Sequence, residues 1–182
     1  MSERYINGLN VAFNSGACTA SGAAATLTVV TAVTFTVKGV WGTAVSAAAK
    51  TLAFVTTSGV ASSSTTGYAT TTAEALYGGA STNANAPSGN QGQSCILLHC
   101  ADAAGAVKTL QGKKVQLDGS GNLMSALEFP TPPDTLTPFC YQVLKAGLTA
   151  GDVVPGKTNH NATGYTNTVF NISTLPKRPY FA

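Results

Sequence analysis

Charged residues are scarce in this sequence. Lys, Arg, Asp and Glu together make up 9% of the 182 residues, whereas they make up about 25% of ordinary soluble domains. The basic residues stand almost singly, and the only adjacent pairs are Lys113 with Lys114 and Lys177 with Arg178. With so few charged residues, scattered along the sequence, we expect no basic surface of the kind that binds nucleic acid. A free monomer with so few surface charges would also associate readily with other copies of itself.

Long apolar runs and a secretory leader pattern are also missing. No segment approaches the roughly 18 uninterrupted apolar residues of a transmembrane helix, so we expect no membrane span. The opening residues, MSERYING, carry an acid early and lead into Asn and Gly, so we expect no signal peptide. The four cysteines are too few for a disulfide framework. We therefore expect a protein that folds in a reducing cytoplasm.

Ala, Thr and Gly are abundant and supply 73 of the 182 positions. Residues 25–30 and 33–38 alternate small or polar side chains with apolar ones, which is the period of a half-buried strand. Residues 94–100 form the most apolar run and predict a central strand. Short apolar runs separated by turn sequences every 8 to 12 residues or so are typical of a sandwich or barrel. We predict an all-β fold, with a single antiparallel β-sandwich or barrel domain over residues 1–182.

The apolar positions of these segments define the expected core. The residues expected to be buried are Leu27, Val29, Phe35, Val37, Ile96, Leu98, Val115, Leu117, Val143 and Phe170. Cys95 and His99 share one face of the strand 94–100, whereas Cys100 points to the other face. Two convergent ligands do not complete a closed zinc site, which needs four. We therefore expect these residues to be part of the core and not to bind a metal.

The segment 56–92 differs from the rest of the chain. It is rich in Ser, Thr, Gly, Ala and Asn, and such a composition buries too little apolar surface to fix itself in place. We expect an extended arm or loop that becomes ordered against a neighbouring molecule. Its interface anchors would be Tyr68, Leu76 and Tyr77, because a few large side chains usually dominate an interface. A solvent-facing loop without a partner is the alternative.

The two ends of the chain are expected to make further intermolecular contacts. The stretches 1–10 and 176–182 also lack the apolar groups to pack on their own domain. Lys177 and Arg178 lie in the second stretch, so we include them among the candidate interface residues.

Residues 151–158, GDVVPGKT, fit the nucleotide-binding pattern G-x-x-x-x-G-K-[ST]. A phosphate-binding loop of this kind also needs a following helix whose N-terminal amides face the phosphates. Asn, Gly and β-branched residues follow Thr158 instead, and these are poor helix formers. Pro155 also lacks the amide hydrogen that would bind phosphate. We expect a turn with an exposed lysine and no nucleotide cofactor.

Candidate catalytic residues do not cluster along the sequence. The two histidines, His99 and His160, lie in an expected core strand and in an Asn-rich loop, and the seven carboxylates are scattered. A catalytic triad can assemble from residues distant in sequence, but few general bases are available here. We expect neither an enzyme nor a bound cofactor.

A series of turns and strand edges follows in order through the second half of the chain. The series comprises residues 102–107 (DAAGAV), 111–112 (QG), 115–122 (VQLDGSGN), 129–134 (FPTPPD), 138–147 (PFCYQVLKAG), 161–164 (NATG) and 174–179 (TLPKRP). This order of elements resembles small tailed-bacteriophage virion proteins of the head decoration or cement type. The likeness covers roughly residues 5–55 and 92–179, and residues 57–91 depart from it.

The resemblance implies a structural role on the virion, and the family carries no catalytic residues. It implies a protein assembled in the host cytoplasm that binds the outer surface of the major capsid protein lattice and stabilises the head. We expect a homotrimer, because closed rings hide strand edges and local three-fold positions are common docking points. A tail or head-fibre component, such as an adhesin, is the alternative. A nucleotide-binding protein, based on residues 151–158, is a less favoured one.

Overall fold

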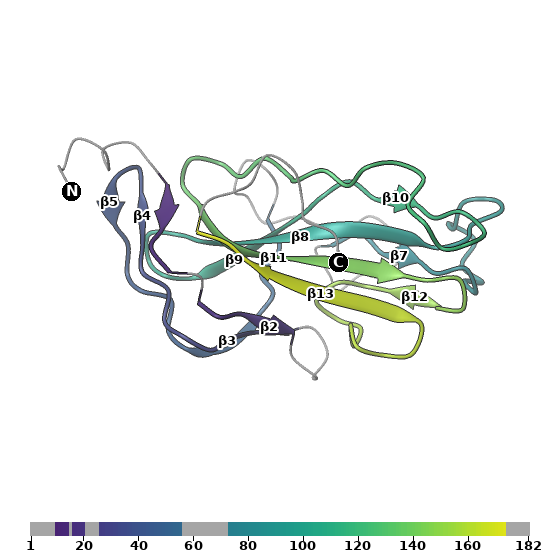
Figure 1. Cartoon of the computed structure of the whole chain (residues 1–182), viewed down its shortest axis with the longest axis horizontal. Coiled ribbons are helices and arrows are strands. Elements are labelled where there is room, and N and C mark those ends of the chain that lie inside the picture. Colours follow the sequence, from purple (N-terminus) through teal and green to yellow (C-terminus); the bar gives the residue numbers. More distant parts are fainter. Residues whose placement is uncertain (1–9, 15, 21–25, 56–72, 174–182) are drawn as a thin grey trace.

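The computed structural model describes residues 10–14, 16–20, 26–55 and 73–173. These residues form thirteen strands and no helix, so the predicted all-β class is confirmed. The strands are distributed over one five-stranded, two three-stranded and one two-stranded sheet, all with antiparallel pairing (Figure 1). The finer expectation of one sandwich or barrel is not confirmed by this arrangement. Within the described ranges, no helix is long and apolar enough to span a membrane.

The five-stranded sheet is the centre of the molecule. Its strands are β8 (Gln93–Ala101), β9 (Val107–Gln111), β10 (Val115–Gln116), β11 (Thr137–Ala146) and β13 (Tyr165–Asn171). One edge of β8 pairs with β11, and its other edge is shared by β10 and β9. Strand β13 pairs with the outer edge of β11. The apolar run at 94–100 is thus a central strand, as the sequence predicts.

The smaller sheets come mainly from the N-terminal part of the chain. Strands β1 (Val11–Ala12), β4 (Phe35–Val37) and β5 (Val40–Trp41) form one, and β2 (Thr19–Ala20), β3 (Thr26–Val29) and β6 (Ala48–Thr51) form another. Strands β7 (Leu76–Tyr77) and β12 (Asp152–Val153) form the two-stranded sheet. The two alternating segments 25–30 and 33–38 therefore enter different sheets and do not pair with each other. Figure 1 places β5 at one end of an elongated molecule and β7, β10 and β12 toward the other.

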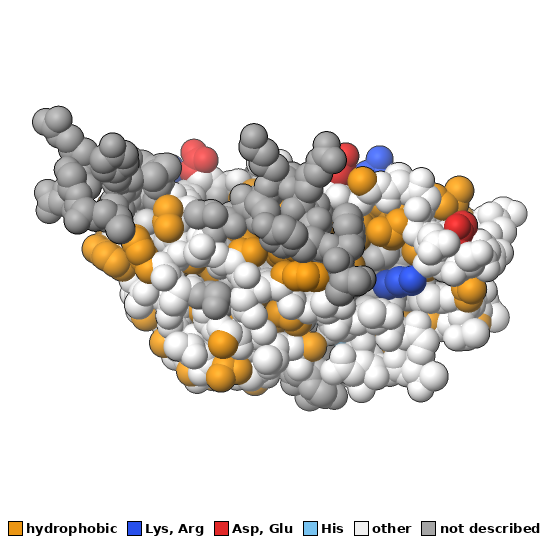
Figure 2. Space-filling model, viewed as in Figure 1, with side chains coloured by type: hydrophobic (Ala, Val, Ile, Leu, Met, Phe, Trp, Pro, Cys, Tyr) orange, Lys and Arg blue, Asp and Glu red, His pale blue; other side chains and the backbone are white. Residues whose placement is uncertain are grey.

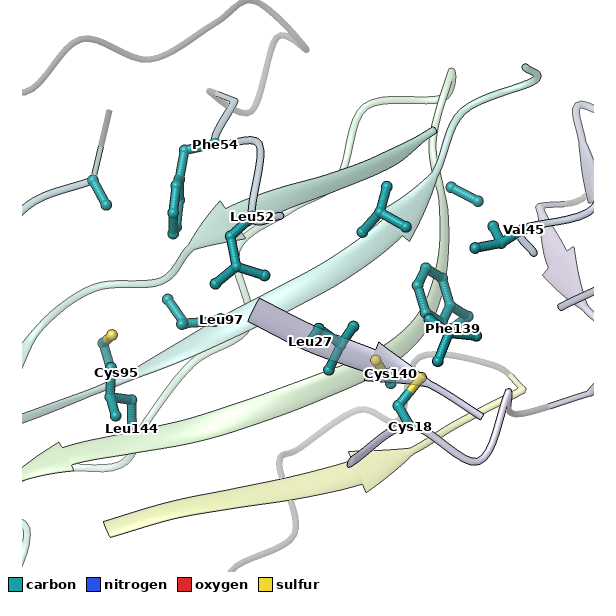
Figure 3. Packing of buried hydrophobic residues seen from close by; sticks show 14 of the residues in the cluster. Cys18, Leu27, Val45, Leu52, Phe54, Cys95, Leu97, Phe139, Cys140 and Leu144 are labelled. Carbon is teal, nitrogen blue, oxygen red and sulfur yellow. The ribbon is translucent and has the colours of Figure 1, made fainter. Parts of the chain in front are cut away.

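The core lies on both faces of the central sheet. Successive side chains of a strand point to opposite faces, so Cys95 and Leu97 join a larger cluster that includes Leu27 of β3 (Figure 3). Ile96 and Leu98 join a second cluster, which includes leucines of the segment between β10 and β11. Both faces of β8 are consequently buried.

The predicted core is largely confirmed. Eight of its ten residues are buried, namely Leu27, Val29, Phe35, Val37, Ile96, Leu98, Val115 and Leu117. Val143 and Phe170 are only partly buried and pack against the second cluster. Both side chains line a groove on that face of the sheet, described below, which explains their remaining exposure.

The part of the predicted arm or loop 56–92 that the structure describes, residues 73–92, is in contact with the rest of the chain. Leu76 is buried in the larger cluster, and Tyr77 is buried in a small third cluster with Ala75 and Val154. Strand β7 pairs with β12, and the Tyr77 amide donates to Gln93 Oε1 at 2.9 Å. The segment thus packs on its own chain.

The backbone of residues 78–79 lies against the backbone of residues 148–150, which explains why few large side chains are needed to hold the segment 73–92 in place. A Cβ atom on Gly78 would lie 2.1 Å from the carbonyl oxygen of Ala150, and one on Gly79 would lie 2.3 Å from that of Leu148. Only glycine permits such contacts between two backbones. The small residues that suggested packing against a neighbour instead allow packing within the chain.

Candidate functional site

Two exposed aromatic side chains, Phe13 and Trp41, lie at the β5 end of the molecule (Figure 1). Phe13 and Trp41 are 43% and 63% exposed, and we refer to these two residues as the aromatic patch. Val40 is 70% exposed, but it precedes Trp41 in β5 and points to the opposite face of the sheet. Figure 2 shows hydrophobic side chains at the end where Figure 1 places β5. Clusters of exposed apolar side chains on a soluble protein often mark interaction sites. The aromatic patch is therefore the candidate functional site.

The two rings of the patch contact each other directly. Trp41 pairs with Thr36 of β4, which on its other side pairs with Val11. Phe13 lies two residues beyond Val11, so its side chain projects from the same face of the sheet as Trp41. The ring centroids are 4.7 Å apart with an interplanar angle of 30°. The pair therefore forms one continuous aromatic surface.

A tight turn presents this surface. Val37 pairs with Val40, which leaves Lys38 and Gly39 as a two-residue connection between β4 and β5. Their φ angles are 52° and 79°, and positive φ at both positions is the signature of a type I′ hairpin turn. Such turns match the twist of the flanking strands. The hairpin therefore holds the exposed Trp41 side chain in a defined direction.

One asparagine ties this turn to the rest of the molecule. The Asn10 side-chain amide donates to the carbonyl oxygens of Asp134 and Leu136, at 2.9 and 3.0 Å. Its Oδ1 accepts the Lys38 amide hydrogen at 2.6 Å. Asp134 and Leu136 directly precede β11, so the aromatic patch is held in a fixed position relative to the central sheet.

A shallow groove of about 290 Å³ lies on the second face of the central sheet. Neutral and apolar side chains line most of it, including Ser94, Val143, Thr166, Thr168 and Phe170. The lysine that lines it, Lys145, donates to the Gly121 carbonyl oxygen. This cation is already engaged by the chain, so the groove offers a less specific site than the aromatic patch.

The segment 151–158 does not have the geometry of a phosphate-binding loop. The amides of Lys157 and Thr158 both donate to the Val154 carbonyl oxygen, at 3.0 and 2.9 Å. The Thr158 hydroxyl accepts the Val154 amide hydrogen at 3.0 Å. The next regular element along the chain is strand β13, not a helix. These amides are used within the chain, so the geometry gives nucleotide binding no support.

Both histidines and all four cysteines are buried, His160 included, although the sequence placed it only in an Asn-rich loop. Cys95 faces the larger cluster and Cys100 the second one, and burial raises the pKa of the Cys95 thiol to about 12. Burial lowers the pKa of both His99 and His160 to about 4. In the part of the chain that the structure describes, no three His, Cys, Asp or Glu side chains lie close enough together to hold a metal ion.

The structure does not bring the predicted interface residues together. Leu76 and Tyr77 are buried within their own chain and are not available to a neighbouring molecule. Tyr68, Lys177 and Arg178 lie outside the described residues, so their role stays a prediction.

The aromatic patch was not predicted from the sequence. One signal was present in the stretch 36–42, TVKGVWG, where Lys-Gly between two β-branched residues is compatible with a hairpin that places the following residues at a sheet edge. In comparisons with known proteins, no protein family, curated protein or solved structure matches the chain.

Proposed function

We propose that this protein is a bacteriophage head decoration, or cement, protein that binds the outer surface of the major capsid protein lattice and stabilises the head. The order of turns and strand edges in the second half of the sequence supports the proposal, together with the scarcity of charge. A surface with few charges suits a protein that works bound to a large assembly. The protein would be assembled in the host cytoplasm and remain on the virion.

The observation that carries the proposal is the exposed pair of contacting rings, Phe13 and Trp41. Tryptophan and other aromatic residues are enriched among the few side chains that dominate binding energy. Each aromatic side chain buries about 150–250 Å² when covered, but ordering and desolvation offset much of the gain. One copy would therefore bind weakly, and a repeated lattice would strengthen attachment through multivalency.

A homotrimer is the oligomer that we propose. Strand β13 is at the edge of the central sheet, and proteins usually pair or cover such edges. A ring of three copies would match the local three-fold positions of an icosahedral shell. Native mass measurement of the isolated protein should give three times the chain mass. A stable monomer at high protein concentration would contradict the trimer.

A binding assay with undecorated capsids tests the function. Purified wild-type protein and the Trp41→Ser and Phe13→Ser variants are each added to capsids that lack the protein, and bound protein is measured after sedimentation. Met124→Ser is the matched control, because Met124 is 69% exposed but lies outside the patch. Trp41→Ser should weaken binding at least about tenfold, and Met124→Ser should bind like the wild type.

The two negative outcomes have different meanings. Equal binding by all variants would remove the aromatic patch from the interface but leave the decoration function in place. Failure of the wild-type protein to bind capsids would contradict the decoration function itself.

A further inference from the structure

Cys18 and Cys140 lie against each other in the core, although they are far apart in the sequence. Both are buried members of the larger cluster, and their thiols are hydrogen-bonded to each other. Figure 3 shows the two sulfur atoms turned toward one another. The fold has thus brought two of the four cysteines of the chain into side-chain contact.

The two cysteines lie at different sheets, Cys140 within one and Cys18 next to another. Cys140 lies in β11 of the central sheet, opposite His99, and Cys18 directly precedes β2 of an N-terminal sheet. Asn171 of β13 holds the backbone of Cys18 in place: its Oδ1 accepts the Cys18 amide hydrogen at 2.6 Å, and its Nδ2 donates to the Cys18 carbonyl oxygen at 3.2 Å. A covalent bond between the thiols would therefore join the two sheets at a position that is already fixed.

We propose that Cys18 and Cys140 form a disulfide site, which closes when the folded protein meets an oxidised small-molecule disulfide such as oxidised glutathione. In the first step, the Cys18 thiolate attacks one sulfur of the small disulfide, which forms a mixed disulfide and releases one small thiolate. In the second step, the Cys140 sulfur attacks the Cys18 sulfur and releases the second. The two cysteine protons end on the two released thiols, and the small disulfide is the species reduced.

The surroundings of the pair determine the order of these steps. Burial raises the pKa of the Cys140 thiol well above its ordinary value, and a protonated thiol is a poor nucleophile. Cys18 is the cysteine nearer the surface and lies beside a two-residue strand. Local opening there would expose Cys18 first, so we expect slow oxidation in the native protein and rapid closure once the mixed disulfide has formed.

The cross-link would stabilise the protein outside a reducing compartment. A bond between these positions closes a long loop, and long loops restrict the unfolded chain most strongly. The protein would be folded with free thiols in the cytoplasm and become cross-linked after release into an oxidising medium. This inference is independent of the proposed capsid binding, since it depends only on the two thiols and their sheets.

The test uses the purified full-length protein with and without oxidised glutathione under native conditions. Peptide mapping should identify a Cys18–Cys140 cross-link, and the intact mass should fall by that of two hydrogen atoms. The thermal unfolding midpoint should rise by about 5–15 °C and return after addition of a reductant. Cys95→Ala should show the same rise, whereas Cys18→Ala should show none.

Four outcomes would overturn the inference. One is that all thiols remain free in the native protein while the same oxidant oxidises the urea-unfolded chain. The others are a stable glutathione adduct without a cross-link, a cross-link that involves Cys95 or Cys100, and a correct cross-link that leaves the midpoint unchanged or lowers it. The wild-type comparison with and without reductant decides the question even if Cys18→Ala does not fold.

Discussion

His99 Nδ1 lies 3.0 Å from Thr109 Oγ1, inside the core between the neighbouring strands β8 and β9. The pKa of His99 is lowered to about 4, mainly by burial and to a smaller extent by His160. Burial also lowers the pKa of His160 to about 4. The ordinary value in an unfolded chain is 6.5. Between these values the unfolded chain binds protons that the native protein does not, so stability decreases as the pH falls.

We expect the free energy of unfolding to decrease from about pH 7 to about pH 5, by up to roughly 1.4 kcal/mol per pH unit for each histidine. Urea unfolding at several pH values measures this slope. His99→Asn should reduce the slope by about half, whatever its effect on stability at neutral pH. A slope that is the same in the wild type and in this variant would show that His99 is already accessible to protons.

Leu98→Ala should lower the free energy of unfolding by about 2–5 kcal/mol, because Leu98 is fully buried in the second cluster. Leu148→Ala is the matched control, since that leucine is exposed, and it should cost less than about 1 kcal/mol. Chemical unfolding of both variants gives the two values. Similar losses in both would show that strand β8 does not form the centre of the sheet.

The turn between β4 and β5 should respond in opposite directions to two substitutions. Gly39→Ala places a side chain at a φ of 79° and should destabilise by about 1 kcal/mol. Lys38→Asn should stabilise slightly, because Asn-Gly is the preferred sequence of a type I′ turn. Thermal unfolding of the two variants tests both signs. A Gly39→Ala protein as stable as the wild type would contradict the turn geometry.

Trp41 is the only tryptophan of the chain, so intrinsic fluorescence reports directly on the aromatic patch. Because its side chain is largely exposed, we expect emission like that of indole in water and efficient quenching by acrylamide. Emission at the short wavelengths of a buried tryptophan would mean that the patch is already covered in the isolated protein, for example by another copy.

The centre of the large sheet could be predicted from the sequence because its two middle strands, β8 and β11, are long and largely apolar. The run 94–100 is apolar at five of its seven positions, and such a run is stable only with both faces covered. The short strands gave no comparable signal. A strand of two residues such as β7 depends on a partner that is remote in sequence, here β12, and that partner is known only once the chain has folded.

The packing of residues 73–92 on their own chain and the aromatic patch were missed for related reasons. Gly78 carries no apolar side chain, yet it fixes its segment through a contact with the Ala150 backbone that composition does not reveal. Conversely, a tryptophan in a strand, such as Trp41, is expected to be buried when only the sequence is known. Its exposure follows from the position of β5 at the edge of a small sheet at the end of the molecule. Exposure there is a property of the tertiary structure and not of the local sequence.

Imaging of intact virus particles tests the central claim most directly. Particles with the protein and particles assembled without it are reconstructed, and the difference density is located. Decoration predicts density on the outer surface of the head, at sites between capsomers, with the end that carries Phe13 and Trp41 facing the shell. Density confined to the tail or to fibres would contradict the account and favour the adhesin alternative.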